Sequence, residues 1–160
     1  MIEPRRGDIM GHTFIHLAYH VVFSTKGRIA CISKDVAPQL HAYMAGIVRG
    51  LGGKALIVNG VADHVHLLVQ LLATISVAEF VRDLKANSSK WMHEEMEIPR
   101  SKFSWQTGYG CFSVSKSNLP NAQKYIARQE EHHQKISFQE EFLLFLKQHE
   151  ITYDEKYIWD

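Results

Sequence analysis

Two histidines stand two residues apart in an apolar stretch of the chain, with the spacing of a metal-binding pair on a β-strand. The stretch covers residues 62–71 and holds His64 and His66. Side chains alternate between the two faces of a strand, so both imidazoles point the same way. Neutral imidazole is the commonest protein ligand of metal ions. The pair therefore predicts a divalent-metal site, and the plain alternative is two histidines tolerated on a strand face.

Further candidate residues lie on either side of this stretch. His16 and His20 share one face of an expected strand and approach the histidine pair if the two strands are neighbours. Tyr125 and Gln129 are four residues apart, which places them on one face of an expected helix. Cations and aromatic side chains suited to contact phosphates and bases are Lys26, Arg28, Arg82, Lys85, Lys90, Trp105 and Tyr109. For these seven residues the alternatives are a solvated surface or core packing.

Length and composition indicate one globular domain. The chain has 160 residues, of which 46% are hydrophobic and 22% are charged. We expect a loose N-terminus at residues 1–11 and a C-terminal extension at residues 135–160. The net charge of +1 neither favours nor excludes a nucleic-acid partner. The sequence has no apolar run of transmembrane length and no apolar segment in residues 1–10, so we expect a cytoplasmic protein without a membrane partner.

The order of the expected elements predicts the fold class. Strands are expected at residues 12–24, 55–58, 64–71 and within 100–115. Helices are expected after Ser33, after a capping box at Ser76, after Asn118 and after a second capping box at Ser137. This order is that of an α+β, ferredoxin-like βαββαβ sandwich with an antiparallel sheet, plus a C-terminal helix that carries the tyrosine. The histidine face is then open unless the Tyr125 helix covers it.

These features together resemble a known family. The residues that carry the resemblance are 19–26 (YHVVFSTK), 63–69 (DHVHLLV), Ser76-Val77, Leu84-Lys85, Tyr125-Ile126 and Gln129. They resemble the single-tyrosine HUH transposases, which comprise the small TnpA-like transposases of insertion sequences and the REP-associated tyrosine transposases. The resemblance covers about residues 12–134. The single tyrosine and the short chain favour this branch over relaxases and replication initiators.

The resemblance implies a metal-dependent DNA transposase. Tyr125 would be the nucleophile, and cleavage of single-stranded DNA would leave a 5′-phosphotyrosine and a free 3′-OH. His64, His66 and Gln129 would hold Mg²⁺ or Mn²⁺. This ligand set carries no charge, so tight metal binding should require the DNA phosphate. The partners implied are single-stranded DNA hairpins and a second copy in a homodimer, with residues 115–119 as the hinge that places the Tyr125 helix in cis or in trans.

Two other functions remain open on the sequence alone. One is a domesticated hairpin-binding module for DNA or RNA that has lost strand transfer. The other is a zinc hydrolase that uses His16, His20, His64 and His66. Zinc sites often include a carboxylate, but the nearest one, Asp63, is expected on the opposite face of the strand. Cys31 and Cys111 have no metal-type spacing, and we expect reduced thiols.

Overall fold

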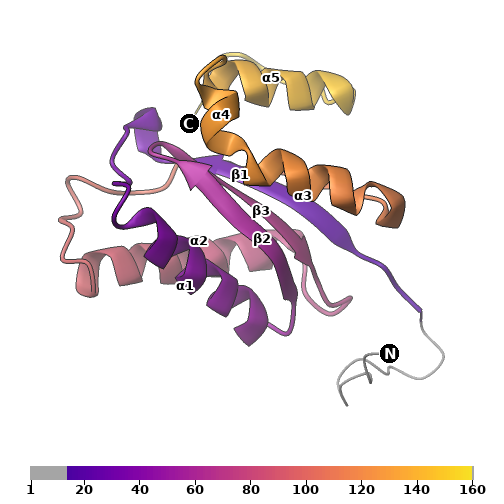
Figure 1. Ribbon diagram of the computed structural model, residues 1–160, viewed down its shortest axis with the longest axis horizontal. Helices are drawn as coiled ribbons and strands as arrows, with labels where there is room; N and C mark the ends of the chain where they lie inside the picture. Colours follow the sequence, from indigo (N-terminus) through magenta and orange to yellow (C-terminus); the bar gives the residue numbers. More distant parts are fainter. Residues whose placement is uncertain (1–13, 160) are drawn as a thin grey trace.

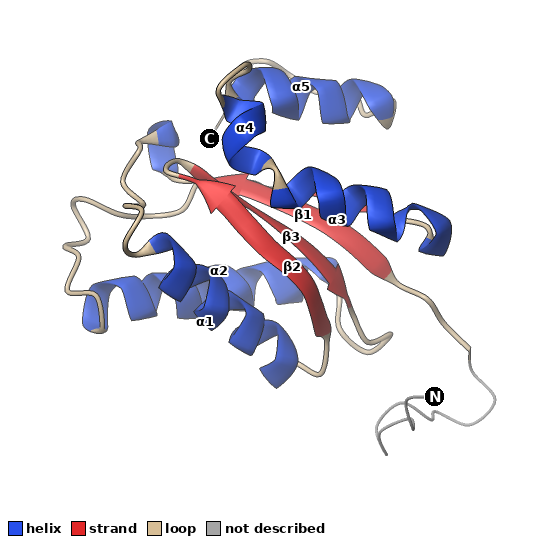
Figure 2. Cartoon of the chain, in the orientation of Figure 1, coloured by secondary structure: helices blue, strands red, loops and turns tan. Residues whose placement is uncertain are grey.

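A four-stranded sheet lies between two layers of helices in the computed structural model (Figures 1 and 2). The structure describes residues 14–159, and the expected loose N-terminus lies outside them. The strands are β1 (Ala18–Ser24), β2 (Lys54–Val61), β3 (His64–Gln70) and β4 (Gly110–Ser113). The helices are α1 (Ala37–Gly50), α2 (Val77–Glu94), α3 (Leu119–Ala127), α4 (Gln129–His133) and α5 (Phe138–Gln148), with short 3₁₀ turns at Lys26–Arg28 and Lys116–Asn118.

The strand order confirms the predicted ferredoxin-like fold. The order in the sheet is β2-β3-β1-β4, and each neighbouring pair is antiparallel. β3 therefore lies inside the sheet, where Val22 of β1 pairs with His66 and Asn59 of β2 pairs with it from the other side. A strand hydrogen-bonded along both edges is held more firmly than an edge strand, so β3 is a rigid support for the two histidines.

The alternation along β3 separates an apolar core from the histidine face. Val65, Leu67 and Val69 lie in the main core beneath α1 and α2, with residues such as Leu40 and Leu84. α1 and α2 lie together on that side of the sheet (Figure 1). The capping box at Ser76 is present at the start of α2, as predicted. None of the described helices is long and apolar enough to cross a membrane.

The opposite face of the sheet is covered by α3, α4 and α5 (Figure 1). The extension at residues 135–160 contributes α5, which begins at the predicted capping box of Ser137. Phe138, Phe142 and Leu146 of α5 pack on Val22 and Phe112 of the sheet. The histidine face is therefore closed, and the extension is part of the body of the domain.

Two element boundaries differ from the prediction. The first strand begins at Ala18, so His16 lies before it and is exposed. The helix expected to carry both Tyr125 and Gln129 is interrupted at Arg128, which has φ −102 and ψ 23, and Gln129 opens α4. The break is explained by a contact from a distant segment, because the side chain of Asn59 on β2 donates to the carbonyls of Ile126 (2.9 Å) and Ala127 (3.3 Å).

The predicted cap of α3 is also only partly present. Asn118 occupies the N-cap position and Pro120 lies in the first turn, but the Asn118 side chain makes no capping hydrogen bond and instead accepts one from Asn121. Ser33 likewise lies before α1 rather than at its N-cap, which is Val36, and its hydroxyl accepts from the Val36 N–H at 3.3 Å.

Candidate active site

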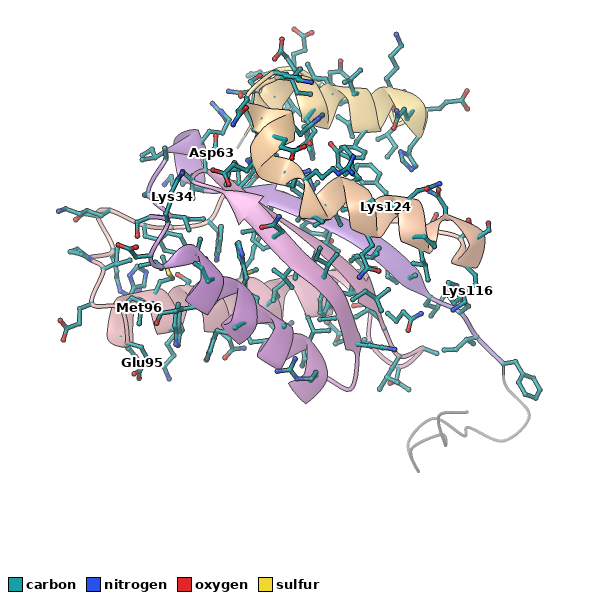
Figure 3. All side chains as sticks on the ribbon, in the orientation of Figure 1. Lys34, Asp63, Glu95, Met96, Lys116 and Lys124 are labelled. Carbon is teal, nitrogen blue, oxygen red and sulfur yellow. The ribbon has the colours of Figure 1, made fainter. Side chains whose placement is uncertain are left out.

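His64 is held with one ring nitrogen facing the space between the sheet and the helices α4 and α5. Its Nδ1 lies 2.6 Å from Oδ1 of Asp63, which corrects the expectation that Asp63 faces away. The reason is that Asp63 lies in the β2–β3 turn, beside α4, and not in the strand (Figure 3). Its backbone carbonyl accepts a hydrogen bond from the Thr25 N–H at 2.8 Å. A carboxylate on Nδ1 fixes the ring and leaves Nε2 for a ligand.

His66 is fixed in the same manner by another histidine. Its Nδ1 lies 2.7 Å from Nε2 of His20, so the expected approach of His20 to the histidine face is confirmed. His20 is buried, and burial and the neighbouring His66 lower its pKa to about 3. His20 therefore supports His66 as a neutral partner. Together with the exposure of His16, this leaves the four-histidine zinc set incomplete.

Two residues of the C-terminal part complete a cluster around these rings. Nε2 of His133, at the end of α4, lies 2.9 Å from Nε2 of His64. Oε1 of Glu141, on α5, lies 2.9 Å from Nε2 of His66, 3.2 Å from Nε2 of His133 and 3.6 Å from Nε2 of His64. These four donor atoms all lie within 4.8 Å of one another.

Tyr125 lies beside this cluster in the same chain. Its ring centroid is 6.1 Å from that of His66, and its hydroxyl donates to Oε2 of Glu141. The hydroxyl oxygen also lies 3.1 Å from Nε2 of His132. Burial and the contact with Glu141 raise the pKa of Tyr125 well above its usual value. The phenol is therefore held in its protonated form in this arrangement.

Gln129 is fully buried and points into the same space. Its Nε2 lies 3.5 Å from Oε2 of Glu141, and its Oε1 has no hydrogen-bond partner among residues 14–159. A buried amide oxygen without a partner is uncommon and needs an explanation, such as an ion. The structure thus brings together His64, His66, Gln129 and Tyr125, the four residues that the sequence singled out for chemistry.

The charges in the site are strongly coupled. Burial lowers the pKa of His66 to about 4, although Glu141 acts in the opposite direction. Burial alone would raise the pKa of Glu141, but the neighbouring His133 and His66 rings outweigh it and hold the pKa far below its usual value. Glu141 is therefore an ionised carboxylate that is almost fully buried. A buried carboxylate needs a compensating positive charge.

The residues predicted to contact DNA separate into two groups. Arg82, Lys85, Trp105 and Tyr109 line one groove of about 450 Å³ between α2 and the segment before β4. Within it, Lys85 donates to the carbonyls of Gln106 (2.8 Å), Thr107 (3.2 Å) and Gly108 (2.6 Å), and burial lowers its pKa to about 8. Trp105 is only 9% exposed. Lys85 is therefore occupied by hydrogen bonds and Trp105 is packed in the core. Arg82 and Tyr109 are exposed.

The other three predicted cations lie outside this groove. Lys26 and Lys90 are exposed. Arg28 is half-buried, because its guanidinium lies 5.3 Å from the Trp159 ring centroid and donates to the Trp159 carbonyl at 3.3 Å. The C-terminal segment therefore packs against the turn that follows β1.

Glu141, His133 and Asp63 were missed or misplaced by the sequence reasoning. A signal for Glu141 was present, since it shares an α5 face with Phe138, Phe142 and Leu146, and an acidic residue on an apolar helix face requires a polar partner inside. No local pattern distinguished His133 from its neighbour His132. The interruption at Arg128 decides which of them faces the sheet.

The structure thus has a tyrosine that faces paired histidines on a ferredoxin-like sheet. Residues 13–129 match the family described as "Transposase IS200 like". The chain belongs to this family of transposases, which cleave and transfer DNA. The match ends at Gln129, so His133 and Glu141 lie beyond it.

Individual relatives agree with this assignment. The ISDra2 transposase TnpA of Deinococcus radiodurans is 27% identical over 132 residues, which are 80% of this chain and 92% of the relative. The transposase for insertion sequence element IS200 of Salmonella typhimurium is 27% identical over 124 residues, covering 75% of this chain and 81% of the relative.

Two solved structures share the fold. A crystal structure of a putative transposase from Deinococcus radiodurans superposes with a TM-score of 0.60 at 25% identity, covering 81% of this chain and 98% of the other. A REP-associated tyrosine transposase bound to a REP hairpin superposes with a TM-score of 0.57 at 13% identity, covering 85% of this chain and 76% of the other. The second likeness shows the fold alone.

Proposed function

We propose that this chain cleaves and rejoins single-stranded DNA at hairpin-bearing ends, with Tyr125 as the nucleophile. The observation that carries the proposal is the position of Glu141, whose carboxylate contacts the Tyr125 hydroxyl on one side and the His66 ring on the other. A scissile phosphate must lie in the same place, between nucleophile and histidines. The hairpin is proposed from the family and from the REP hairpin bound by the second structural relative.

The bond changes balance without an external energy source. The Tyr125 oxygen attacks phosphorus, and the bond from phosphorus to the 3′-oxygen breaks. The phenol loses its proton, and the departing 3′-oxygen gains one to become the 3′-OH. The 5′-phosphotyrosine keeps the phosphodiester energy, so attack by another 3′-OH rejoins DNA and releases the tyrosine.

The donors present fit a divalent ion held by His64, His66 and Gln129. Both histidines have Nδ1 engaged, by Asp63 and His20, and the Gln129 Oε1 has no partner. An ion here would withdraw electrons from the phosphate and stabilise the charge of the transition state. We propose Mg²⁺ or Mn²⁺ for this step.

Access to the site requires a rearrangement. His64, His66 and Gln129 are all 0% exposed, so DNA reaches them only when Glu141 gives up its place. A homodimer that exchanges the Tyr125 helix is one route, proposed from the family; in the single chain the tyrosine lies at its own histidines. The proposed DNA contacts are the exposed Arg82 and Tyr109 of the α2 groove.

The test is a denaturing-gel assay for a covalent adduct. Labelled single strands from both sides of the gene are incubated with Mn²⁺ or Mg²⁺, with EDTA as the metal-free control. We expect a metal-dependent adduct at the 5′ end of the released fragment, abolished by Tyr125→Phe. Tyr43→Phe is the matched control, because the Tyr43 ring is exposed and stacks on Trp91. An adduct that persists in Tyr125→Phe contradicts the assigned nucleophile.

The closed site favours one other function, a hairpin-binding module without strand transfer. It predicts binding of the same strands with no adduct and no effect of EDTA. The same gel, run beside a native binding assay, separates the two functions.

A further inference from the structure

Residues beyond the family match add two donors to the histidine pair. His133 and Glu141 follow residue 129, where the match ends, and their donor atoms lie with those of His64 and His66 in one cluster. We propose that His64, His66, His133 and Glu141 bind a divalent transition-metal ion in the DNA-free protein. This inference goes beyond the proposed function, with which it shares His64 and His66, and it does not require strand cleavage.

The distances suit a single ion. A tetrahedral ion lies about 2.0–2.1 Å from nitrogen donors, which sets neighbouring donors about 3.3 Å apart. The measured separations lie on both sides of that value, with 2.9 Å from His64 Nε2 to His133 Nε2 and 3.6 Å from His64 Nε2 to Glu141 Oε1. The separations from Glu141 Oε1 to His66 Nε2 and His133 Nε2 are 2.9 Å and 3.2 Å. Small side-chain movements are enough to admit the ion.

The hydrogen-bond partners of the rings direct two lone pairs at each other. Asp63 accepts from Nδ1–H of His64, and the Ile136 carbonyl, 3.0 Å from Nδ1 of His133, can only accept. In the neutral form each ring then carries its lone pair on Nε2. Two lone pairs at 2.9 Å repel unless a cation lies between them. A shared proton and a metal ion are the two cations that satisfy this geometry.

A second observation favours the metal ion. Nε2 of His66 is buried without a hydrogen-bond partner, although Glu141 Oε1 is 2.9 Å away. The contact lacks the geometry of a hydrogen bond, so a proton on His66 Nε2 does not satisfy it. An ion that lies off the line between His66 Nε2 and Glu141 Oε1 can be coordinated by both atoms at once.

The types of donor atom determine which metal ions suit the site. Three imidazoles and one carboxylate suit Zn²⁺, Co²⁺ or Mn²⁺, whereas Mg²⁺ prefers oxygen donors and water. The Glu141 carboxylate also provides the negative charge that the His64, His66 and Gln129 set lacks. The ion is therefore retained without DNA, in contrast with the expectation for that three-residue set.

The experiment is a titration of the chelator-treated full-length chain with Co²⁺ alone and with Zn²⁺ alone. The readouts are the visible absorption of Co²⁺, isothermal calorimetry and the change in Tm. We expect one ion per chain and a Co²⁺ spectrum without thiolate bands, since Cys31 and Cys111 lie outside the cluster. Loss of a direct ligand should weaken binding by more than the roughly 10–100-fold that loss of an outer partner costs.

Four variants decide the outcome. Glu141→Gln keeps the size of the side chain, and its control is Glu131→Gln on the exposed part of α4. His133→Asn is matched by His16→Asn, which is exposed. We expect the two cluster variants to lose affinity and the Tm increase with metal, while both controls keep them. Circular dichroism of each metal-free variant verifies that it is folded.

Two results would overturn the inference. The first is wild-type affinity in both Glu141→Gln and His133→Asn, which reduces the site to the three-residue set of the proposed function. The second is the absence of Co²⁺ and Zn²⁺ binding without DNA, which leaves a shared proton as the cation. Neither result affects the adduct assay, so a failure of the inference is distinguishable from a failure of the proposed function.

Discussion

Replacing Asp63 tests whether its contact with His64, a proposed metal ligand, determines the affinity for metal. The Asp63 carboxylate lies 2.6 Å from Nδ1 of His64 and fixes the ring with Nε2 facing His133. Burial alone would raise the pKa of Asp63, but the hydrogen bond from His64 outweighs it and holds the pKa below its usual value. Asp63 is therefore ionised at neutral pH, and the bond is charge-assisted. The backbone of the turn is held separately by Thr25, so a change of side chain leaves the loop in place.

The expected magnitude follows from the kind of hydrogen bond that is lost. A bond to a charged group contributes about 1.5–3 kcal/mol and a neutral one about 0.5–1.5 kcal/mol. Asp63→Asn keeps an acceptor oxygen and loses the charge, a difference of about 1.4 kcal/mol, which is roughly tenfold in affinity. Asp63→Ala also removes the acceptor and leaves the His64 N–H without a partner, for which we expect up to about 100-fold.

The assay is the metal dependence of two signals, calorimetric binding and adduct formation over a range of Mn²⁺ concentrations. Asp35→Asn, on the exposed surface before α1, is the control. We expect the metal concentration for half-saturation to rise in the order wild type, Asp63→Asn, Asp63→Ala, with the adduct level restored at high Mn²⁺. Equal half-saturation in all three proteins would refute the role of Asp63 in orienting His64.

Three further predictions concern the framework of the site. His41 is a half-buried histidine whose Nε2 is buried and has no hydrogen-bond partner among the described residues, and burial lowers its pKa to about 4. In the unfolded chain the pKa of His41 is near 6.5, so the unfolded state binds the proton first as the pH falls. This costs up to about 3 kcal/mol of stability between pH 6.5 and pH 4. Urea unfolding of His41→Leu should show a smaller loss of stability from pH 7 to pH 4.5 than the wild type, and an equal loss would contradict this. Phe142→Ala removes a buried ring from the α5 contact, at a cost of about 3–5 kcal/mol, and hydrogen exchange should rise in α5 and not in β1 or β3; a uniform rise would show that α5 is not a separable unit. In Gly60→Ala, the new Cβ would press on the backbone of His64, whereas the Cβ of Gly50→Ala meets nothing within 4 Å. We expect the free energy of unfolding, measured by urea titration, to fall by about 1–3 kcal/mol in Gly60→Ala alone; equal values for the two variants would contradict the close approach.

Alternation and capping made most of the fold predictable. The period of two along β3 placed His64 and His66 on the face opposite Val65 and Leu67, and both are found there. Ser76 and Ser137 mark the starts of α2 and α5 because a capping box is a local motif, complete within four residues. The strand order followed from the order of the elements, since βαββαβ chains have few ways to bury one face of a sheet.

The parts that were not predictable depend on contacts between distant segments. The side chain of Asn59, on β2, donates hydrogen bonds to the last carbonyls of α3, and the chain turns at Arg128. This turn decides that His133 meets His64, a contact across 69 residues. Asp63 was assigned to the wrong face because the alternation of a strand was applied to a residue that lies in the turn before β3. No periodicity in the sequence encodes any of these three contacts.

The position of Glu141 connects the proposed metal site to the reactivity of Tyr125. Its Oε1 faces His66 and His133, while its Oε2 accepts the hydrogen bond of Tyr125. The buried carboxylate therefore keeps the Tyr125 phenol protonated while Glu141 remains. On the proposed function, a DNA phosphate competes for the same place. When it enters, the histidines exchange one anionic partner for another, and the Tyr125 oxygen loses the acceptor that held its proton and gains a phosphorus atom to attack. Displacement of one side chain would then couple DNA entry to activation of Tyr125.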